Sequence, residues 1–258
     1  MDLTTHYLGL DLKNPLIVGS SPLTMTVESI RECAGGGGGA VVRKALCEEE
    51  MRAANRAVGD SLAEEGNWQT EVFDYIEAEI GMRYGTREYL ELIRQAKDEV
   101  DIPIIASINC LSGDWWLDFA LEAQAAGADA VELNIAILPM ELKSTSAEIE
   151  NRYEHIVRRT AEALRVPVAV KLPPYFSAPG AVILRLREAG ASGFVLFNRL
   201  YRPTVDIASL RLCVTENERY STPGELSPSL RWISLVADRV AADFAAATGV
   251  HSGADLVR

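Results

Sequence analysis

Short apolar runs alternate with longer amphipathic stretches from one end of the chain to the other. Each apolar run is a few residues long, is rich in Val and Ile, and is almost continuous in its apolar character. Strands that are buried on both faces of a parallel sheet have this pattern. We therefore predict strands within residues 15–21, 40–46, 102–109, 130–136, 166–172, 193–199 and 242–249.

The stretches between these runs have the spacing of helices. The clearest examples are residues 87–100, 116–127 and 147–165. In the third stretch, apolar side chains recur at spacings that place them on one helix face; they are Ile149, Tyr153, Ile156, Val157 and Ala161. The whole pattern therefore predicts strands and helices in alternation.

An internal repeat supports this alternation. Residues 122–134 and 186–198 share a helix end, an Ala-Gly turn and a buried strand that closes on Asn, and residues 32–44 resemble a third copy. The five glycines at 35–39 stand before a strand, and no Lys-Ser or Lys-Thr follows them. A phosphate-binding loop follows a strand, so we interpret these glycines as a helix-to-strand turn.

Repeated strand–helix units in one chain favour a (β/α)8 TIM barrel over a doubly wound sheet. We predict a single domain over residues 1–258, with an N-terminal β-hairpin at 3–14 that plugs the bottom of the barrel. Two excursions, 47–85 and 200–229, interrupt the rhythm. Both follow a strand, so we expect them on the face where barrel active sites form.

Composition narrows the range of functions. The formal net charge of −12 argues against nucleic acid and anionic membranes as partners, because phosphates attract Lys and Arg. No apolar run approaches the roughly 18 residues of a membrane span, and the N-terminus lacks the plan of a signal peptide. The chain has three histidines and four scattered cysteines, which argues against a metal site. We expect a cytoplasmic protein that acts on a small-molecule substrate.

Polar side chains gather where the predicted strands end. In a barrel these ends meet at one mouth, where the chemistry lies. Lysines, amides and small hydroxyls at such a mouth suit a polar, partly anionic ligand, and a flavin fits because a lysine stabilises its reduced form. A Schiff-base lysine is the rival interpretation, through Lys44 or Lys171. The residues at these strand ends are Ser20, Ser21, Lys44, Asn109, Asn134, Lys171, Asn198, Thr248 and Gly249.

These segments resemble, in order, those of the FMN-dependent dihydroorotate dehydrogenases. The similar motifs are NPLIVGSSPLT, VVRKAL, SIN, VKLPPYF, FNR and ATGVHSGAD, of which VKLPPYF is the most specific. The resemblance implies FMN as cofactor, oxidation of a CH–CH bond as in pyrimidine biosynthesis, and flavin contacts from the strand-end residues named above. The electron acceptor and the formation of a homodimer stay open.

The chain departs from the family pattern at the catalytic base. The family has a Cys or Ser where this chain has Ile137, which can neither accept nor donate a proton. Cys110 or Tyr175 is a weak candidate to replace it. The orotate-gripping loop is not reproduced within residues 48–79, and after residue 258 the family would continue with an eighth strand, so we expect a truncated barrel with reduced FMN affinity.

Three functions therefore remain open. The first is a divergent dihydroorotate dehydrogenase-like oxidoreductase whose natural substrate, dihydroorotate or another molecule, stays open. The second is a non-catalytic flavin-binding protein that has lost the base. The third is a Schiff-base lyase that uses Lys171, for which the sequence shows no acid–base partner.

Overall fold

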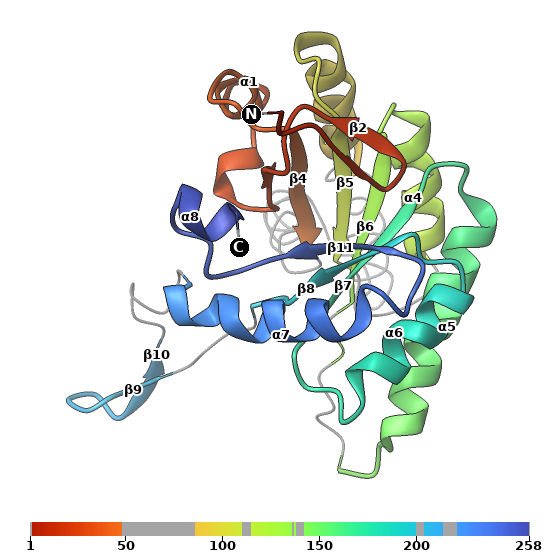
Figure 1. The fold of residues 1–258 in the computed structure, drawn as a ribbon, viewed down its shortest axis with the longest axis vertical. Helices are drawn as coiled ribbons and strands as arrows, with labels where there is room; N and C mark the ends of the chain where they lie inside the picture. Colours follow the sequence, from red (N-terminus) through yellow and green to blue (C-terminus); the bar gives the residue numbers. More distant parts are fainter. Residues whose placement is uncertain are drawn as a thin grey trace, which may run out of the picture.

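The centre of the molecule is a parallel sheet of seven strands that follow one another in chain order (Figure 1). The structure is a computed structural model, and it describes residues 2–47, 86–109, 115–135, 137, 142–199, 204–213 and 221–257. All seven predicted strands are confirmed. They are β3 (Ile17–Val18), β4 (Ala40–Cys47), β5 (Ile104–Asn109), β6 (Ala130–Asn134), β7 (Val168–Leu172), β8 (Gly193–Leu196) and β11 (Asp243–Ala246).

Helices alternate with these strands and flank the curled sheet on its outer side (Figure 1). This is the strand–helix order of a (β/α)8 barrel, and the predicted fold class is confirmed. Within the described residues the sheet does not close, because β3 and β11 each pair on one side only. The helices are α1 (Val27–Gly35), the helix at 86–99, α4 (Trp115–Ala125), α5 (Ser146–Ala163), α6 (Pro179–Glu188), α7 (Leu226–Val236) and α8 (Gly253–Val257).

Alternate residues of each strand belong to two different cores. On β6, for example, Val131 and Leu133 pack in the large core between the sheet and the helices. Ala130, on the other face of the same strand, belongs to a smaller core inside the curl of the sheet. This alternation follows from the period-two geometry of a strand. A polar side chain two residues further along from an inner-core residue therefore faces the interior of the barrel.

An N-terminal hairpin covers the bottom of the sheet, as predicted. Strands β1 (Thr5–Tyr7) and β2 (Leu10–Leu12) pair antiparallel. The N–H of Leu8 donates to Oδ2 of Asp243 over 2.6 Å, at the start of β11. A Cβ on Gly193 would lie only 2.7 Å from the Leu8 side chain, so glycine at the start of β8 lets the hairpin tip pack closely.

The three repeat copies end their helices with the same turn. Gly37, Gly127 and Gly190 have φ angles of +99°, +99° and +110°. At Gly127, the glycine N–H bonds the carbonyl of Gln124 and the next N–H bonds that of Ala123, which is a Schellman cap. The turns at Gly37 and Gly190 have the same two bonds. The glycines at 35–39 therefore form a helix-to-strand turn, as predicted.

The two predicted excursions are described to different extents. Residues 48–85 lie outside the described part of the chain, so the prediction for 47–85 stays a prediction. Within 200–229, a second hairpin pairs β9 (Thr204–Asp206) with β10 (Arg211–Cys213), and η3 (Pro223–Glu225) leads into α7. Both follow β8, at the carboxyl end of the sheet. In the described residues no helix is long and apolar enough to cross a membrane.

Candidate functional site

Three of the predicted site residues meet at the carboxyl ends of β6, β7 and β8. Asn134 is the last residue of β6, and its partner in the parallel ladder is Lys171 of β7. Asn198 follows β8, where its backbone N–H donates to the carbonyl of Leu172 over 2.7 Å. The side-chain Nδ2 of Asn198 donates to Oδ1 of Asn134 over 2.8 Å. The structure therefore brings Asn134, Lys171 and Asn198 together, as a shared mouth requires.

A buried polar cluster lies one layer below this mouth, inside the barrel. Glu132 is two residues before Asn134 on the same face of β6, and it is 3% exposed. Its Oε1 accepts a hydrogen bond from Ser107 Oγ over 3.1 Å and lies 4.0 Å from Lys171 Nζ. The Lys171 cation therefore has a carboxylate as its neighbour on the side away from the mouth.

The hairpin plug contributes a tyrosine to the underside of this cluster. Burial raises the pKa of the Tyr7 phenol, and the negative charges of Glu132 and Asp243 raise it further. Because the phenol stays protonated, the floor of the barrel carries no charge from Tyr7. The charges at the centre of the site are therefore those of Lys171 and Glu132.

Ser20, Lys44 and Asn109 mark the neighbouring strand ends. Ser20 Oγ accepts a hydrogen bond from the N–H of Ala45 over 2.7 Å, next to Lys44. The ladder between β4 and β5 shifts its register between Arg43 and Leu46, so Lys44 lies within a strand irregularity. Ser20 thus fixes the backbone that carries this second lysine.

Ser21, next to Ser20, caps the start of a short helix. Its N–H donates to Thr24 Oγ1 over 3.3 Å and its carbonyl accepts from the Thr24 N–H over 3.0 Å. These bonds start the short helix η1 (Pro22–Thr24). A flavin contact from Ser21 stays a prediction.

The turn after β11 is tight and strained. Thr248 and Gly249 have positive φ angles of 71° and 75°, which is unusual for a β-branched residue such as threonine. A Cβ at Gly249 would lie 2.2 Å from the backbone nitrogen of Leu226, so only glycine fits. The Gly249 N–H donates to Ser221 Oγ over 3.1 Å. Such strain is often kept at functional turns.

Two of the three residues considered in connection with the catalytic base, Ile137 and Tyr175, belong to the described part of the chain. Ile137 packs in the outer core and is 9% exposed, and its N–H donates to the Tyr153 hydroxyl over 3.3 Å. Tyr175 is 46% exposed, and burial raises the pKa of its hydroxyl, so the tyrosinate form that could accept a proton is less populated. Cys110 lies outside the described residues. The role of each in catalysis stays a prediction.

Glu132, Ser107 and Ser221 belong to the site but were not predicted from the sequence. Glu132 and Ser107 lie inside runs that are apolar on average. One polar residue changes the average hydropathy of such a run too little to be noticed. A period-two count would have found both, since each lies two residues before a strand-end Asn. Among the described residues no group of three His, Cys, Asp or Glu side chains could hold a metal ion.

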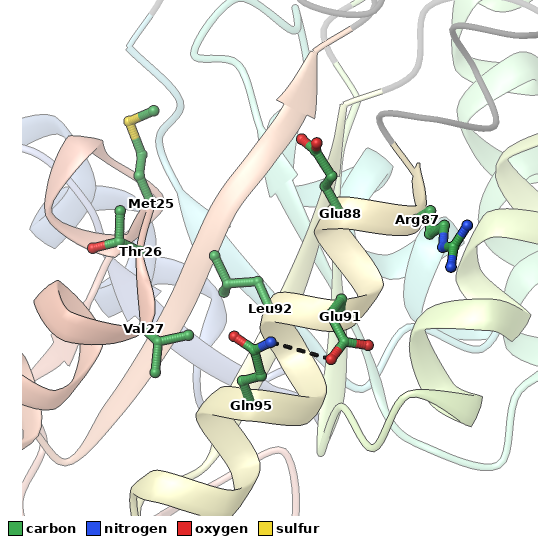
Figure 2. A pocket seen from close by; sticks show the side chains of 8 residues that line it. All are labelled: Met25, Thr26, Val27, Arg87, Glu88, Glu91, Leu92 and Gln95. Carbon is green, nitrogen blue, oxygen red and sulfur yellow. Dashed lines mark hydrogen bonds between the residues drawn. The ribbon is translucent and has the colours of Figure 1, made fainter.

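A hollow lies elsewhere, between η1–α1 and the helix at 86–99 (Figure 2). It measures about 630 Å³, and Met25, Val27 and Leu92 line it together with charged residues such as Glu91. Oε1 of Glu91 accepts a hydrogen bond from Gln95 Nε2 over 3.1 Å (Figure 2). The hollow contains none of the predicted site residues. The chemistry of the strand ends, rather than the size of a hollow, therefore locates the candidate site.

Several known proteins similar in sequence are catalytic subunits of dihydroorotate dehydrogenase B (NAD(+)). The chain is 30% identical to that of Pyrococcus abyssi over 236 residues, which is 89% of this chain and 73% of that protein. It is 27% identical to that of Thermoplasma acidophilum, over 99% of this chain and 82% of that protein. It is 30% identical to that of Methanocella arvoryzae, over 80% of this chain and 65% of that protein. No protein-family model matches the chain.

Solved structures similar to this chain support the barrel. An IMP dehydrogenase/GMP reductase-like protein from Corynebacterium glutamicum aligns with a TM-score of 0.50 at 16% identity. A Pediococcus acidilactici protein described as a lactate oxidase aligns with a TM-score of 0.51, also at 16% identity. Each alignment covers 98% of this chain and 62% of the solved chain, so this chain spans less than two thirds of either. At this identity the likeness concerns the fold alone.

Proposed function

The chain belongs to the dihydroorotate dehydrogenase family, and we propose that it binds FMN at the carboxyl ends of its strands and oxidises a CH–CH bond of a small molecule. The observation that carries the proposal is the meeting of Lys171 with the bonded pair Asn134 and Asn198. A cation beside amide donors and acceptors suits a planar ligand with several acceptor atoms and a negative charge in its reduced form.

The chemistry of the donor set fits FMN. Lys171 supplies the cation, Asn134 and Asn198 supply amide groups, and Ser20 and Lys44 lie at neighbouring strand ends. The backbone of Gly249 approaches that of Leu226 so closely that a side chain is excluded, and a contact of this turn with the FMN phosphate is part of the proposal. When bound, FMN would accept a hydride from the substrate carbon.

In this proposal the residues of the chain bind, orient and balance charge. Lys171 stabilises the negative charge that accumulates in its vicinity during reduction. The asparagine pair orients the ligand through hydrogen bonds. The β1–β2 hairpin closes the inner face of the sheet from below, because Leu8 and Tyr7 are buried against it, and so keeps water away from that side.

Ile137 makes dihydroorotate a poor substrate in this proposal. The position takes the proton in the family, and the loss of a positioned base typically costs about 10²–10⁴-fold in rate. We therefore propose that the natural substrate is another small molecule whose oxidation does not depend on a base at this position. The electron acceptor is not part of the proposal.

A non-catalytic flavin-binding protein is the second candidate, and Ile137 is the observation that favours it. The Schiff-base alternative gains a carboxylate partner in Glu132, 4.0 Å from Lys171, but it has no support among the relatives. Uptake of FMN would support the oxidoreductase and the non-catalytic flavin-binding protein and would argue against the lyase.

The test is the visible spectrum of the purified protein with added FMN, before and after anaerobic dihydroorotate. We expect bound FMN with a shifted spectrum, followed by bleaching that takes minutes rather than milliseconds. Bleaching of the flavin, whether fast or slow, supports the oxidoreductase. Bound FMN that no CH–CH donor reduces supports the non-catalytic candidate. A protein that takes up no FMN contradicts the proposal.

A further inference from the structure

Glu132 is a charged side chain that lies inside the barrel, below the mouth and next to Lys171. It lies on β6, with its residue only 3% exposed. Two residues before Glu132 on the same face of β6, Ala130 is part of the apolar inner core. Two residues after it, Asn134 lies at the mouth. The carboxylate is therefore placed between an apolar floor and the predicted flavin site.

The surroundings of Glu132 only partly compensate the negative charge of its carboxylate. Within the described residues, its hydrogen bonding is limited to the Ser107 hydroxyl, at 3.1 Å. The nearest cation is Lys171 Nζ, at 4.0 Å, which is longer than a charge-assisted hydrogen bond. A buried charge with so few partners costs stability, and an apolar pair of similar size would often be as stable or more so. Stability therefore does not explain why the chain has Glu132.

The geometry of Lys171 suggests what Glu132 does. The Cα of Lys171 is level with Asn134 in the parallel ladder, yet its ammonium lies near a carboxylate one layer deeper. The side chain of Lys171 is 15% exposed, so the ammonium is mostly removed from water. The same ammonium can be attracted inward by Glu132 or outward by a negative charge at the mouth.

We propose that Glu132 competes with the flavin for the Lys171 ammonium and thereby weakens the binding of reduced FMN relative to oxidised FMN. Glu132 is in this sense a positioning residue that acts through Lys171, and the inference rests on the flavin-binding function proposed above. Oxidised FMN has no charge at its ring for the ammonium to stabilise, whereas the anionic reduced ring has one. Glu132 therefore affects the two forms unequally and holds the midpoint potential of the bound flavin down.

The test is the midpoint potential of FMN bound to the full chain, measured by spectroelectrochemistry. In Glu132→Gln the amide keeps the size of the side chain and its contact with Ser107 but removes the charge. We expect reduced FMN to bind about tenfold more tightly relative to oxidised FMN, which corresponds to a rise of about 30 mV for a two-electron couple. Glu132→Asp, which keeps the charge but withdraws it by one methylene, should give a smaller rise of the same sign.

Asp129→Asn is the matched control. Asp129 directly precedes β6 and pairs with Lys97 at 2.7 Å, so this variant also removes one negative charge from a carboxylate–lysine pair. Lys97 belongs to the helix at 86–99 on the outer side of the sheet, so the midpoint potential should stay unchanged. The Lys171→Met background tests the route, because Glu132→Gln should then change the ratio of the two affinities less than about twofold.

Each outcome decides the inference. An unchanged or lower potential in both Glu132 variants overturns it, and so does an equal rise in the Lys171→Met background, which would mean a direct action on the flavin. A lower thermal stability with an unchanged potential assigns Glu132 a structural role and also overturns it. A wild-type protein without FMN uptake overturns the proposed function together with this inference, whereas the other results leave the proposed function intact.

Discussion

Lys171 is the residue whose replacement has the most direct consequence for the proposed cofactor. We expect Lys171→Ala to lower FMN affinity at least tenfold, because the cation beside the ligand is lost. Lys97→Ala, which removes a lysine from the Asp129 pair on the outer side of the sheet, should leave FMN affinity unchanged. FMN titration with fluorescence detection measures both.

Removal of Lys171 also leaves Glu132 buried without its counter-ion, which is destabilising by about 3–5 kcal/mol for a broken buried pair. The double variant Lys171→Ala/Glu132→Gln removes both charges and should recover most of that stability. If it does so and still binds FMN as wild type does, Lys171 does not contact the flavin.

The asparagine pair gives a second prediction at the residue scale. Asn134→Leu and Asn198→Leu should each lower the affinity for FMN or substrate about tenfold or more, because a buried polar group left without its partner costs about 1–3 kcal/mol. Since the two side chains bond one another, the effects of the two changes should not add in the double variant. Isothermal titration of all three variants measures this. Wild-type affinity in both single variants would return the pair to a structural role.

The third prediction concerns Ile137. If it occupies the position of the missing base, Ile137→Cys combined with Ala136→Ser should accelerate flavin reduction by dihydroorotate, measured by stopped-flow bleaching. The gain should be modest, because Ile137 is buried in the outer core and the substrate-gripping segment differs from that of the family. Fast reduction in the unmodified protein would mean that another residue already accepts the proton, and Cys110 would be examined first.

At the residue scale, the sequence predicted which residues meet at the mouth of the barrel better than it predicted their hydrogen-bond partners. Asn134, Lys171 and Asn198 were expected at one mouth because each closes a buried strand, and parallel strands end on one side. The bond between the two asparagines could not be predicted, because it depends on side-chain torsions after β8. Glu132 was overlooked for a different reason, since one acid in an apolar run does not change the run's average.

At the scale of the element, the β1–β2 hairpin leads to a prediction about alkaline stability. The folded-state pKa of Tyr7 is raised by burial and then by Glu132 and Asp243, whereas an unfolded tyrosine titrates near 10. Above pH 10 the unfolded state therefore releases a proton that the native state retains. The stabilisation is complete below pH 10 and declines by about 1.4 kcal/mol per pH unit above it.

Tyr7→Phe should remove this part of the decline. Urea unfolding at pH 9 and pH 11 should show a smaller loss of unfolding free energy in Tyr7→Phe than in wild type, by roughly 1 kcal/mol. Tyr175→Phe is the control. Because Tyr175 is 46% exposed, this variant should change the decline of the unfolding free energy less than Tyr7→Phe does. Equal declines in wild type and Tyr7→Phe would show that the hairpin opens before Tyr7 titrates.

Element types were predictable because periodicity and turn chemistry agree along the chain. The strand runs, the helix at 146–163 and the repeated glycine turns each have a local physical cause. Except for β4, the strands proved shorter than the apolar runs, as in β3 (Ile17–Val18) within 15–21, because an apolar run continues past the last ladder bond. The hairpin's function as a plug depends on the contact of Leu8 with Asp243, which no local pattern reveals.

At the scale of the whole molecule, the unequal neighbours of the strands predict unequal protection. Strands β6 and β7 have partners on both sides, whereas β3 and β11 have one each within the described residues. Asp243 and Ala247 donate their N–H groups toward β8, so the alternate amides of Phe244 and Ala246 point to the side on which β11 has no strand partner among the described residues. We expect these two to exchange with deuterium orders of magnitude faster than the amides of Val131 and Val170.

Hydrogen exchange at two protein concentrations tests this expectation. Slow exchange at Phe244 and Ala246 that appears only at high concentration would indicate that a second copy covers the edge. Slow exchange at both concentrations would contradict the prediction.

The bond between Leu8 and Asp243 has a consequence for how the chain acquires its shape during synthesis. It joins positions 235 residues apart, and contacts of such long sequence separation form late and slowly. The hairpin is synthesised well before its carboxylate acceptor, so the strands from β3 to β8 are made before this bond can hold the hairpin against their inner face. We therefore expect newly made chains to depend on chaperones until β11 has emerged.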